Sequence, residues 1–113
     1  MMLFSYFLAS TIFVLSSAFK LCFKNDYKFD CQFEIYDPIQ SDFPVKILPV
    51  LNPGNQTSFD APYKGSFRVT GQFVSYPLHE VNASSQPYGT PVDCVMDYKG
   101  LICYSTTQSS YCP

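Results

Sequence analysis

Apolar and polar residues alternate with a period of two along several stretches of this chain, and the helical period of 3.6 residues is almost absent. The three clearest stretches are Lys28–Tyr36, Ser66–Tyr76 and Val92–Tyr98. Because successive side chains of a strand point to opposite faces, each stretch predicts a β-strand with one buried face. The residues that share the apolar face in the first stretch are Phe29, Cys31, Phe33 and Ile35.

The other predicted elements are shorter and are bounded by turn residues. The segment 45–51 predicts a strand at a sheet edge, since Pro44 and Pro49 cannot donate a hydrogen bond to a neighbouring strand. The rest are a short strand over 57–59, a strand or loop over 78–81, a polar loop over 82–91, and a hairpin that turns at Lys99-Gly100 into a strand over 101–104. The pattern therefore predicts an all-β fold.

The N-terminal segment Met1–Ala18 has the features of a removable secretion signal. It contains no charged side chain, and the run from Leu3 to Leu15 is apolar apart from three hydroxyl residues. Ser16 and Ala18 are small residues at the positions that a signal peptidase reads before Phe19. We therefore expect residues 1–18 to be a signal peptide, and residues 19–113 to form one secreted, extracellular domain without a transmembrane anchor.

Two N-x-[ST] sequons agree with this compartment. They begin at Asn55 and at Asn82, and both lie in sequence typical of loops. Both asparagines are predicted to carry N-linked glycans.

Charge and composition narrow the classes of partner. The net charge is −2 and no run of like charge occurs, which argues against a nucleic-acid surface and against a polybasic membrane patch. Aromatic residues make up 18% of the chain, so many rings must lie inside so small a domain.

Catalytic and metal-binding patterns are not found in the sequence. The single histidine, His79, has no serine elbow or glycine-rich phosphate loop to work with, and no pair of cysteines has zinc-ligand spacing. Asp93 and Asp97 would share a strand face but lie too far apart for an aspartyl dyad. We expect a protein that is not an enzyme and that has no cofactor and no metal site.

Five cysteines, at positions 22, 31, 94, 103 and 112, leave one without a partner if two bridges form. Cys103 and Cys112 enclose a loop-like segment and could pair, whereas Cys94 and Cys103 could pair across the predicted hairpin. A long-range bridge such as Cys31–Cys94 would restrict the unfolded chain more. The fifth cysteine is expected either to be buried or to bridge to another chain.

Several short segments between residues 43 and 113 stand out together. They are Val45–Gly54, Ser58-Phe59, the V-x-G strand Gly65–Gly71, Gly89-Thr90-Pro91, and Cys103 with Cys112-Pro113. These segments resemble motifs of the secreted ML lipid-recognition family, in particular its fungal members related to phosphatidylglycerol/phosphatidylinositol transfer proteins. The resemblance covers roughly residues 43–113.

This resemblance implies an immunoglobulin-like antiparallel β-sandwich that holds one lipid between its two sheets. It also implies a disulfide between Cys103 and Cys112. Members of the family continue past this point with two further strands, so the resemblance implies a sandwich that is shortened at its C-terminus.

Two functions follow as alternatives. A lipid carrier would hold the acyl chain of a phospholipid or fatty acid, or a whole sterol, in an apolar slot. On the predicted strands, the residues that would line it are Phe33, Ile35, Ile47, Phe59, Phe67, Val69 and Phe73. The rival is a secreted interaction module, such as an effector, adhesin or receptor-binding domain, that binds a host or cell-surface protein. An internal cavity favours the first, and a filled core with an exposed apolar patch favours the second.

Overall fold

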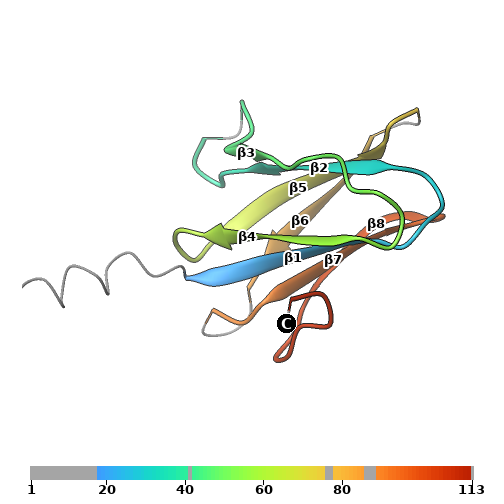
Figure 1. Ribbon diagram of the computed structural model, residues 1–113. Helices are drawn as coiled ribbons and strands as arrows, with labels where there is room; N and C mark the ends of the chain where they lie inside the picture. The colour runs from blue at the N-terminus through green and yellow to red at the C-terminus, as the bar shows by residue number, and fades with distance from the viewer. Residues whose placement is uncertain (1–17, 41, 76–77, 86–88, 113) are drawn as a thin grey trace, which may run out of the picture.

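The computed structural model describes residues 18–40, 42–75, 78–85 and 89–112, and these contain eight strands and no helix (Figure 1). The strands are β1 (Phe19–Asn25), β2 (Cys31–Tyr36), β3 (Lys46–Ile47), β4 (Gln56–Ala61), β5 (Ser66–Phe73), β6 (His79–Ser84), β7 (Val92–Asp97) and β8 (Gly100–Ser105). They form two four-stranded sheets that pack face to face, so the predicted all-β sandwich is confirmed.

One sheet has the strand order β4-β1-β7-β8 and the other has the order β3-β2-β5-β6. All neighbours are antiparallel except β1 and β7, which run parallel with Leu21 beside Val92. The parallel pair places the first described strand of the chain beside one of the last.

Alternation explains how the strands bury their apolar sides. In β2 and β5 the inward residues are buried and the outward ones are polar, as the sequence pattern predicts. Pairing in regular register then sets Phe33 beside Gly71 and Ile35 beside Val69. The two inner faces meet in the core, where the rings of Phe23 and Phe33 lie 4.8 Å apart between centroids.

Three elements differ from the prediction. The sequence pattern did not predict β1. The residues of this strand alternate between two faces, but Cys22 on the outer face is apolar and Asn25 on the inner face is polar, which obscures the pattern. The segment 82–84, predicted as part of a loop, belongs to β6, where Asn82 pairs with Arg68. The edge strand predicted over 45–51 shrinks to the two residues of β3.

The two long sides of the sandwich are not alike. On one side, β6 and β8 lie against each other, and the Ser105 hydroxyl donates a hydrogen bond of 2.5 Å to the Ser84 carbonyl oxygen. On the other side lie β3 and β4, the remaining edge strands of the described sheets.

Candidate functional site

Most of the residues predicted to line a lipid slot fill the interior instead. Phe33, Ile35, Phe67 and Val69 are completely buried, and Phe73 is nearly so. Neighbouring rings pack against them, as between Phe19 and Phe67, whose centroids lie 5.8 Å apart. The hollows that the described residues form are lined by other side chains, so no lipid-binding cavity is seen between the sheets in this part of the chain.

Two of the predicted lining residues lie elsewhere. Ile47 is 53% exposed, because β3 pairs it with the outward-facing Glu34, and Leu48 is the buried residue of this segment. The prediction that Ile47 points inward is therefore wrong. Phe59 faces the core from the edge strand β4 and is half-buried.

The disulfides differ from the pairing that the ML resemblance implies. Cys103 bonds to Cys94, its direct neighbour across the β7–β8 hairpin, with the two Cα atoms 4.1 Å apart. Cys112 bonds to Cys22 in β1. The predicted Cys103–Cys112 bridge is thus wrong, because hairpin register places another cysteine opposite Cys103, and one argument for the resemblance is lost.

The fifth cysteine, Cys31, is a buried free thiol on the inner face of β2. Burial, reinforced by the nearby charge of Asp30, raises its pKa to about 12. Of the two expectations for the odd cysteine, burial is the one that the structure shows.

The segment 106–112 forms a strap over the outer face of the β4-β1-β7-β8 sheet, which sequence reasoning missed. Asp93 is completely buried beneath it. Its carboxylate accepts a hydrogen bond of 2.5 Å from the Ser109 hydroxyl and one of 2.8 Å from the Ser110 backbone N–H. The pKa of Tyr111 is raised to about 12, mainly by burial and then by a hydrogen bond with Tyr104. Asp93 is thus a structural residue that holds the strap.

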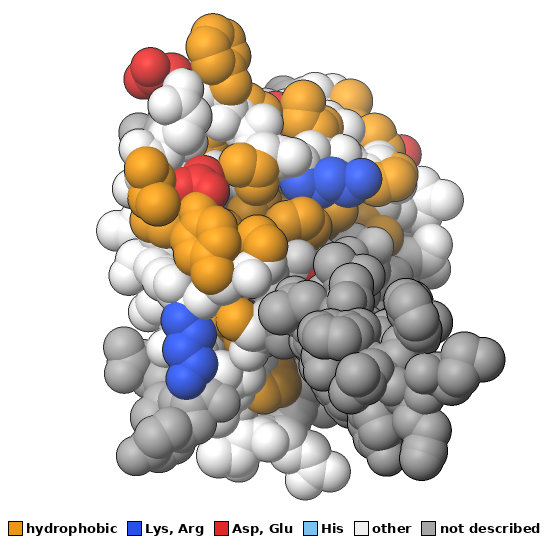
Figure 2. Space-filling view, turned by 90° about the vertical axis from the view of Figure 1, so that its left-hand side faces the viewer, with side chains coloured by type: hydrophobic (Ala, Val, Ile, Leu, Met, Phe, Trp, Pro, Cys, Tyr) orange, Lys and Arg blue, Asp and Glu red, His pale blue; other side chains and the backbone are white. Residues whose placement is uncertain are grey.

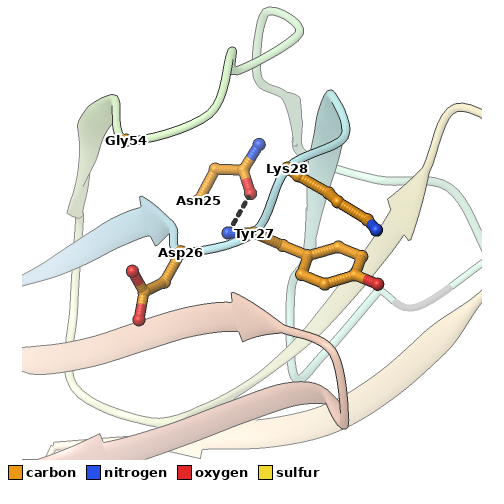
Figure 3. Close-up of a pocket in the computed structure, with 5 residues that line it drawn as sticks. All are labelled: Asn25, Asp26, Tyr27, Lys28 and Gly54. Carbon is orange, nitrogen blue, oxygen red and sulfur yellow. Dashed lines mark hydrogen bonds between the residues drawn. The ribbon is translucent and has the colours of Figure 1, made fainter.

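A polar hollow of about 500 Å³ lies at one end of the sandwich, beside the β1–β2 connection (Figure 3). The Asn25 side chain is buried there, and its amide nitrogen donates hydrogen bonds to the carbonyl oxygens of Phe29 and Leu51, at 2.7 and 2.9 Å. Its oxygen accepts one from the Tyr27 backbone N–H at 3.1 Å. Since Asn25 uses its hydrogen-bonding groups to hold the chain, and Asp26 points away from Tyr27 and Lys28, these groups do not converge on a ligand (Figure 3).

At the opposite end, the connection between β2 and β3 is anchored at its base. The Asp37 carboxylate accepts hydrogen bonds from the Tyr63 hydroxyl and from the Ile39 backbone N–H, and these lower its pKa. Donation to Asp37 raises the pKa of Tyr63. The Tyr63 ring packs on the buried Phe67 ring at 5.6 Å, so the connection is tied to the core.

Glycine completes this anchor. A β-carbon at Gly65 would lie 3.2 Å from the Pro38 ring, so the missing side chain lets the two connections approach closely. The base of the 37–45 loop is therefore held by a hydrogen bond and by close packing.

Beyond its anchored base, the 37–45 loop exposes apolar side chains to solvent. Ile39 is 85% exposed and Phe43 is 74% exposed, and Val45 at the end of the loop is also exposed. In the space-filling view of this end, hydrophobic side chains gather across the upper half, at the height of the β2–β3 connection in Figure 1 (Figure 2). We call Ile39, Phe43 and Val45 the loop patch.

The remaining predicted sites have these positions. Asn55 is exposed at a turn before β4, and Asn82 is exposed on β6, so both sequons are accessible. Within the described ranges, no cluster of His, Cys, Asp or Glu has the geometry of a metal site. No helix that is long and apolar enough to span a membrane is found among the same residues. The predicted signal peptide lies outside the described residues except for Ala18.

No protein-family model matches this sequence, and no curated protein matches it.

Proposed function

We propose that this protein is a secreted interaction module that binds an extracellular protein through the loop patch. The observation that carries the proposal is the exposure of Ile39 and Phe43 on a loop whose base is fixed to the core. Large apolar side chains held in solvent cost free energy in the isolated protein, and burial against a partner recovers it. Because the base of the loop is held, the loop loses less conformational entropy on binding than an unanchored segment would, which favours affinity.

The covalent structure supports an extracellular site of action. Two disulfides, Cys22–Cys112 and Cys94–Cys103, are compatible with an oxidising compartment. The predicted signal peptide and the exposed Asn55 and Asn82 agree with it.

Lipid carriage stays a prediction, and the packing of the interior favours the interaction module over it. A β-carbon at Gly71 would lie 3.3 Å from both the Met96 sulfur and the Phe33 ring. Space this tight between the sheets leaves little room for an acyl chain unless the sheets separate.

Binding to cells tests the proposal. The labelled protein, secreted from a eukaryotic host, is titrated onto intact cells, onto cells whose surface proteins were removed by protease, and onto phosphatidylcholine vesicles. We expect saturable binding to intact cells only. The double variant Ile39→Ser/Phe43→Ser should bind at least tenfold more weakly, since it removes most of the loop patch. The matched control is Val74→Ser, because Val74 is 66% exposed and follows the far end of β5.

A further variant tests the anchored base. Tyr63→Phe removes the hydroxyl that holds Asp37 but leaves the loop patch intact, so binding should weaken by a smaller factor. Equal binding by the wild type and Ile39→Ser/Phe43→Ser would overturn the proposal. A lipid that accompanies the protein in native mass spectrometry, with displacement of a fluorescent fatty acid or sterol, would favour the lipid carrier instead.

A further inference from the structure

β4 is a six-residue edge strand that leaves one side of its backbone unpaired among the described residues. β4 pairs with β1 on one side only, since it ends the order β4-β1-β7-β8. The Asn25 N–H donates to the Asn55 carbonyl oxygen at 3.0 Å, and β1 and β4 then pair in regular antiparallel register. Backbone groups of alternate residues point the same way. The backbone N–H and carbonyl groups of Thr57 and Phe59 therefore face β1. The same groups of the alternate residues of β4 face away from β1.

The residues whose backbone groups face away are Gln56, Ser58 and Asp60. Their side chains are exposed, and the structure gives their backbone groups no hydrogen bond within the described residues. Three N–H groups and three carbonyl groups thus lie along one open edge, without a proline to interrupt them.

The other three sheet edges do not offer such a row. β6 and β8 lie against each other and are tied by the hydrogen bond between Ser105 and Ser84. β3 has only two residues and is followed closely by Pro49, which cannot donate to a ladder.

We propose that β4 pairs antiparallel with β4 of a second copy of this chain, about a two-fold axis at Ser58. In this register Ser58 lies opposite Ser58 of the second copy, and Gln56 lies opposite Asp60 of the second copy. All the outward N–H and carbonyl groups of the three edge residues then find partners, and the two four-stranded sheets join into one continuous sheet.

The side chains of β4 are complementary in this arrangement. Asp60 is held by Lys20 of β1 at 3.5 Å, and Gln56 pairs with Lys24 of the same strand. Asp60 of one copy therefore meets the neutral Gln56 of the other, with Lys24 one strand further along, and no like charges lie opposite each other. On the inner face, the half-buried Phe59 would be covered by Thr57 of the second copy.

Sedimentation equilibrium of the secreted full chain tests the pairing at micromolar concentration. Ser58→Pro removes one N–H from the open edge and leaves the hydrogen bonds to β1 intact, while the control Ser58→Ala keeps the N–H. We expect the wild type and Ser58→Ala to dimerise, and Ser58→Pro to associate at least tenfold more weakly with an unchanged thermal midpoint at low concentration.

Charge variants at the two-fold axis keep the test valid if the proline disturbs folding. Ser58→Lys and Ser58→Glu each place like charges opposite each other, so each should be a monomer, and an equimolar mixture should form a heterodimer. A mixture that stays monomeric while the wild type dimerises would place the interface elsewhere and overturn the proposal.

The sequon at Asn55 requires one more comparison, because a glycan there would stand beside the end of the paired strands. A monomeric wild type with a dimeric Asn55→Gln variant would support the β4 interface and show that the glycan blocks it. Monomers in both forms would overturn the proposal. Dimerisation should be unchanged in the variant Ile39→Ser/Phe43→Ser. A failure of the dimer proposal is therefore distinguishable from a failure of the proposed function.

Discussion

Cys22 and Cys112, 90 positions apart in the sequence, are joined by a disulfide that fastens the strap to the outer face of β1. The strap lies over Asp93 of β7, which pairs with Cys22 in the parallel register. One covalent bond and two hydrogen bonds to Asp93 thus hold the end of the described chain against the two strands at the centre of this sheet.

The two disulfides should contribute unequally to stability. Cys22–Cys112 closes a loop of 90 positions and Cys94–Cys103 one of 9. In the chain-entropy account, the long loop contributes about 4 to 5 kcal/mol and the short one about 2.5 kcal/mol. Denaturant unfolding of Cys22→Ala/Cys112→Ala and of Cys94→Ala/Cys103→Ala should show the larger loss in the first. An equal or reversed order would mean that strain or packing, and not loop length, sets the contribution.

Gly71→Ala distinguishes a filled core from a lipid slot. The added methyl group would meet the Met96 sulfur and the Phe33 ring at 3.3 Å, so overpacking should cost about 1 to 3 kcal/mol of unfolding free energy. Phe33→Leu in the same chain should offset part of this cost, which a double-mutant cycle measures. Unchanged stability of Gly71→Ala would indicate free space between the sheets and would favour lipid carriage.

The Cys31 thiol should make stability depend on alkaline pH. Its pKa is about 12 in the folded protein against an ordinary 9.0, so the folded state keeps a proton that the unfolded chain loses. The stability contributed by the neutral thiol is complete below pH 9 and declines as the pH rises from 9 towards 12. Unfolding free energies across this range should fall more steeply for the wild type than for Cys31→Ala.

Alkylation gives an independent measurement of the same thiol. Iodoacetamide should leave Cys31 unmodified in the native protein and modify it once denaturant unfolds the chain, because the buried thiol is neutral and inaccessible. Rapid modification of the native protein would contradict the burial of Cys31.

Thr70→Val should leave stability unchanged or raise it by about 1 kcal/mol. The Thr70 hydroxyl is buried and has no hydrogen-bond partner among the described residues, so removing it relieves a desolvation cost. Thr70→Ser is the matched control, since it keeps the hydroxyl and loses a methyl group, and it should be the less stable of the two. A clear loss of thermal stability in Thr70→Val would mean that the hydroxyl is bonded.

The fold was largely predictable from alternation. Strands β2, β5 and β7 lie within the predicted stretches, and Gly100 turns the predicted hairpin into β8. Alternation records which residues face the core and does not record which strands are neighbours. The parallel pairing of β1 and β7 could therefore not be predicted.

The candidate site was harder to predict from the sequence than the fold was. Ile39 and Phe43 lie outside any alternating stretch, so the pattern does not show whether they are exposed. The base of their loop is held by the contact between Asp37 and Tyr63, 26 positions apart. The disulfides depend on register in the same way, because Cys103 meets whichever residue lies opposite it in β7. A pattern along the chain shows local preference, and these contacts are set by tertiary structure.

The order of the strands along the chain also has a consequence for the growing polypeptide. All four strands of the sheet β3-β2-β5-β6 have been made by residue 84, before β7 begins at Val92. The disulfide partner of Cys22 is made 90 positions later, as Cys112. The core around Cys31 includes Val92, Cys94 and Met96 of β7, so the odd cysteine is fully enclosed only after β7 has joined the fold.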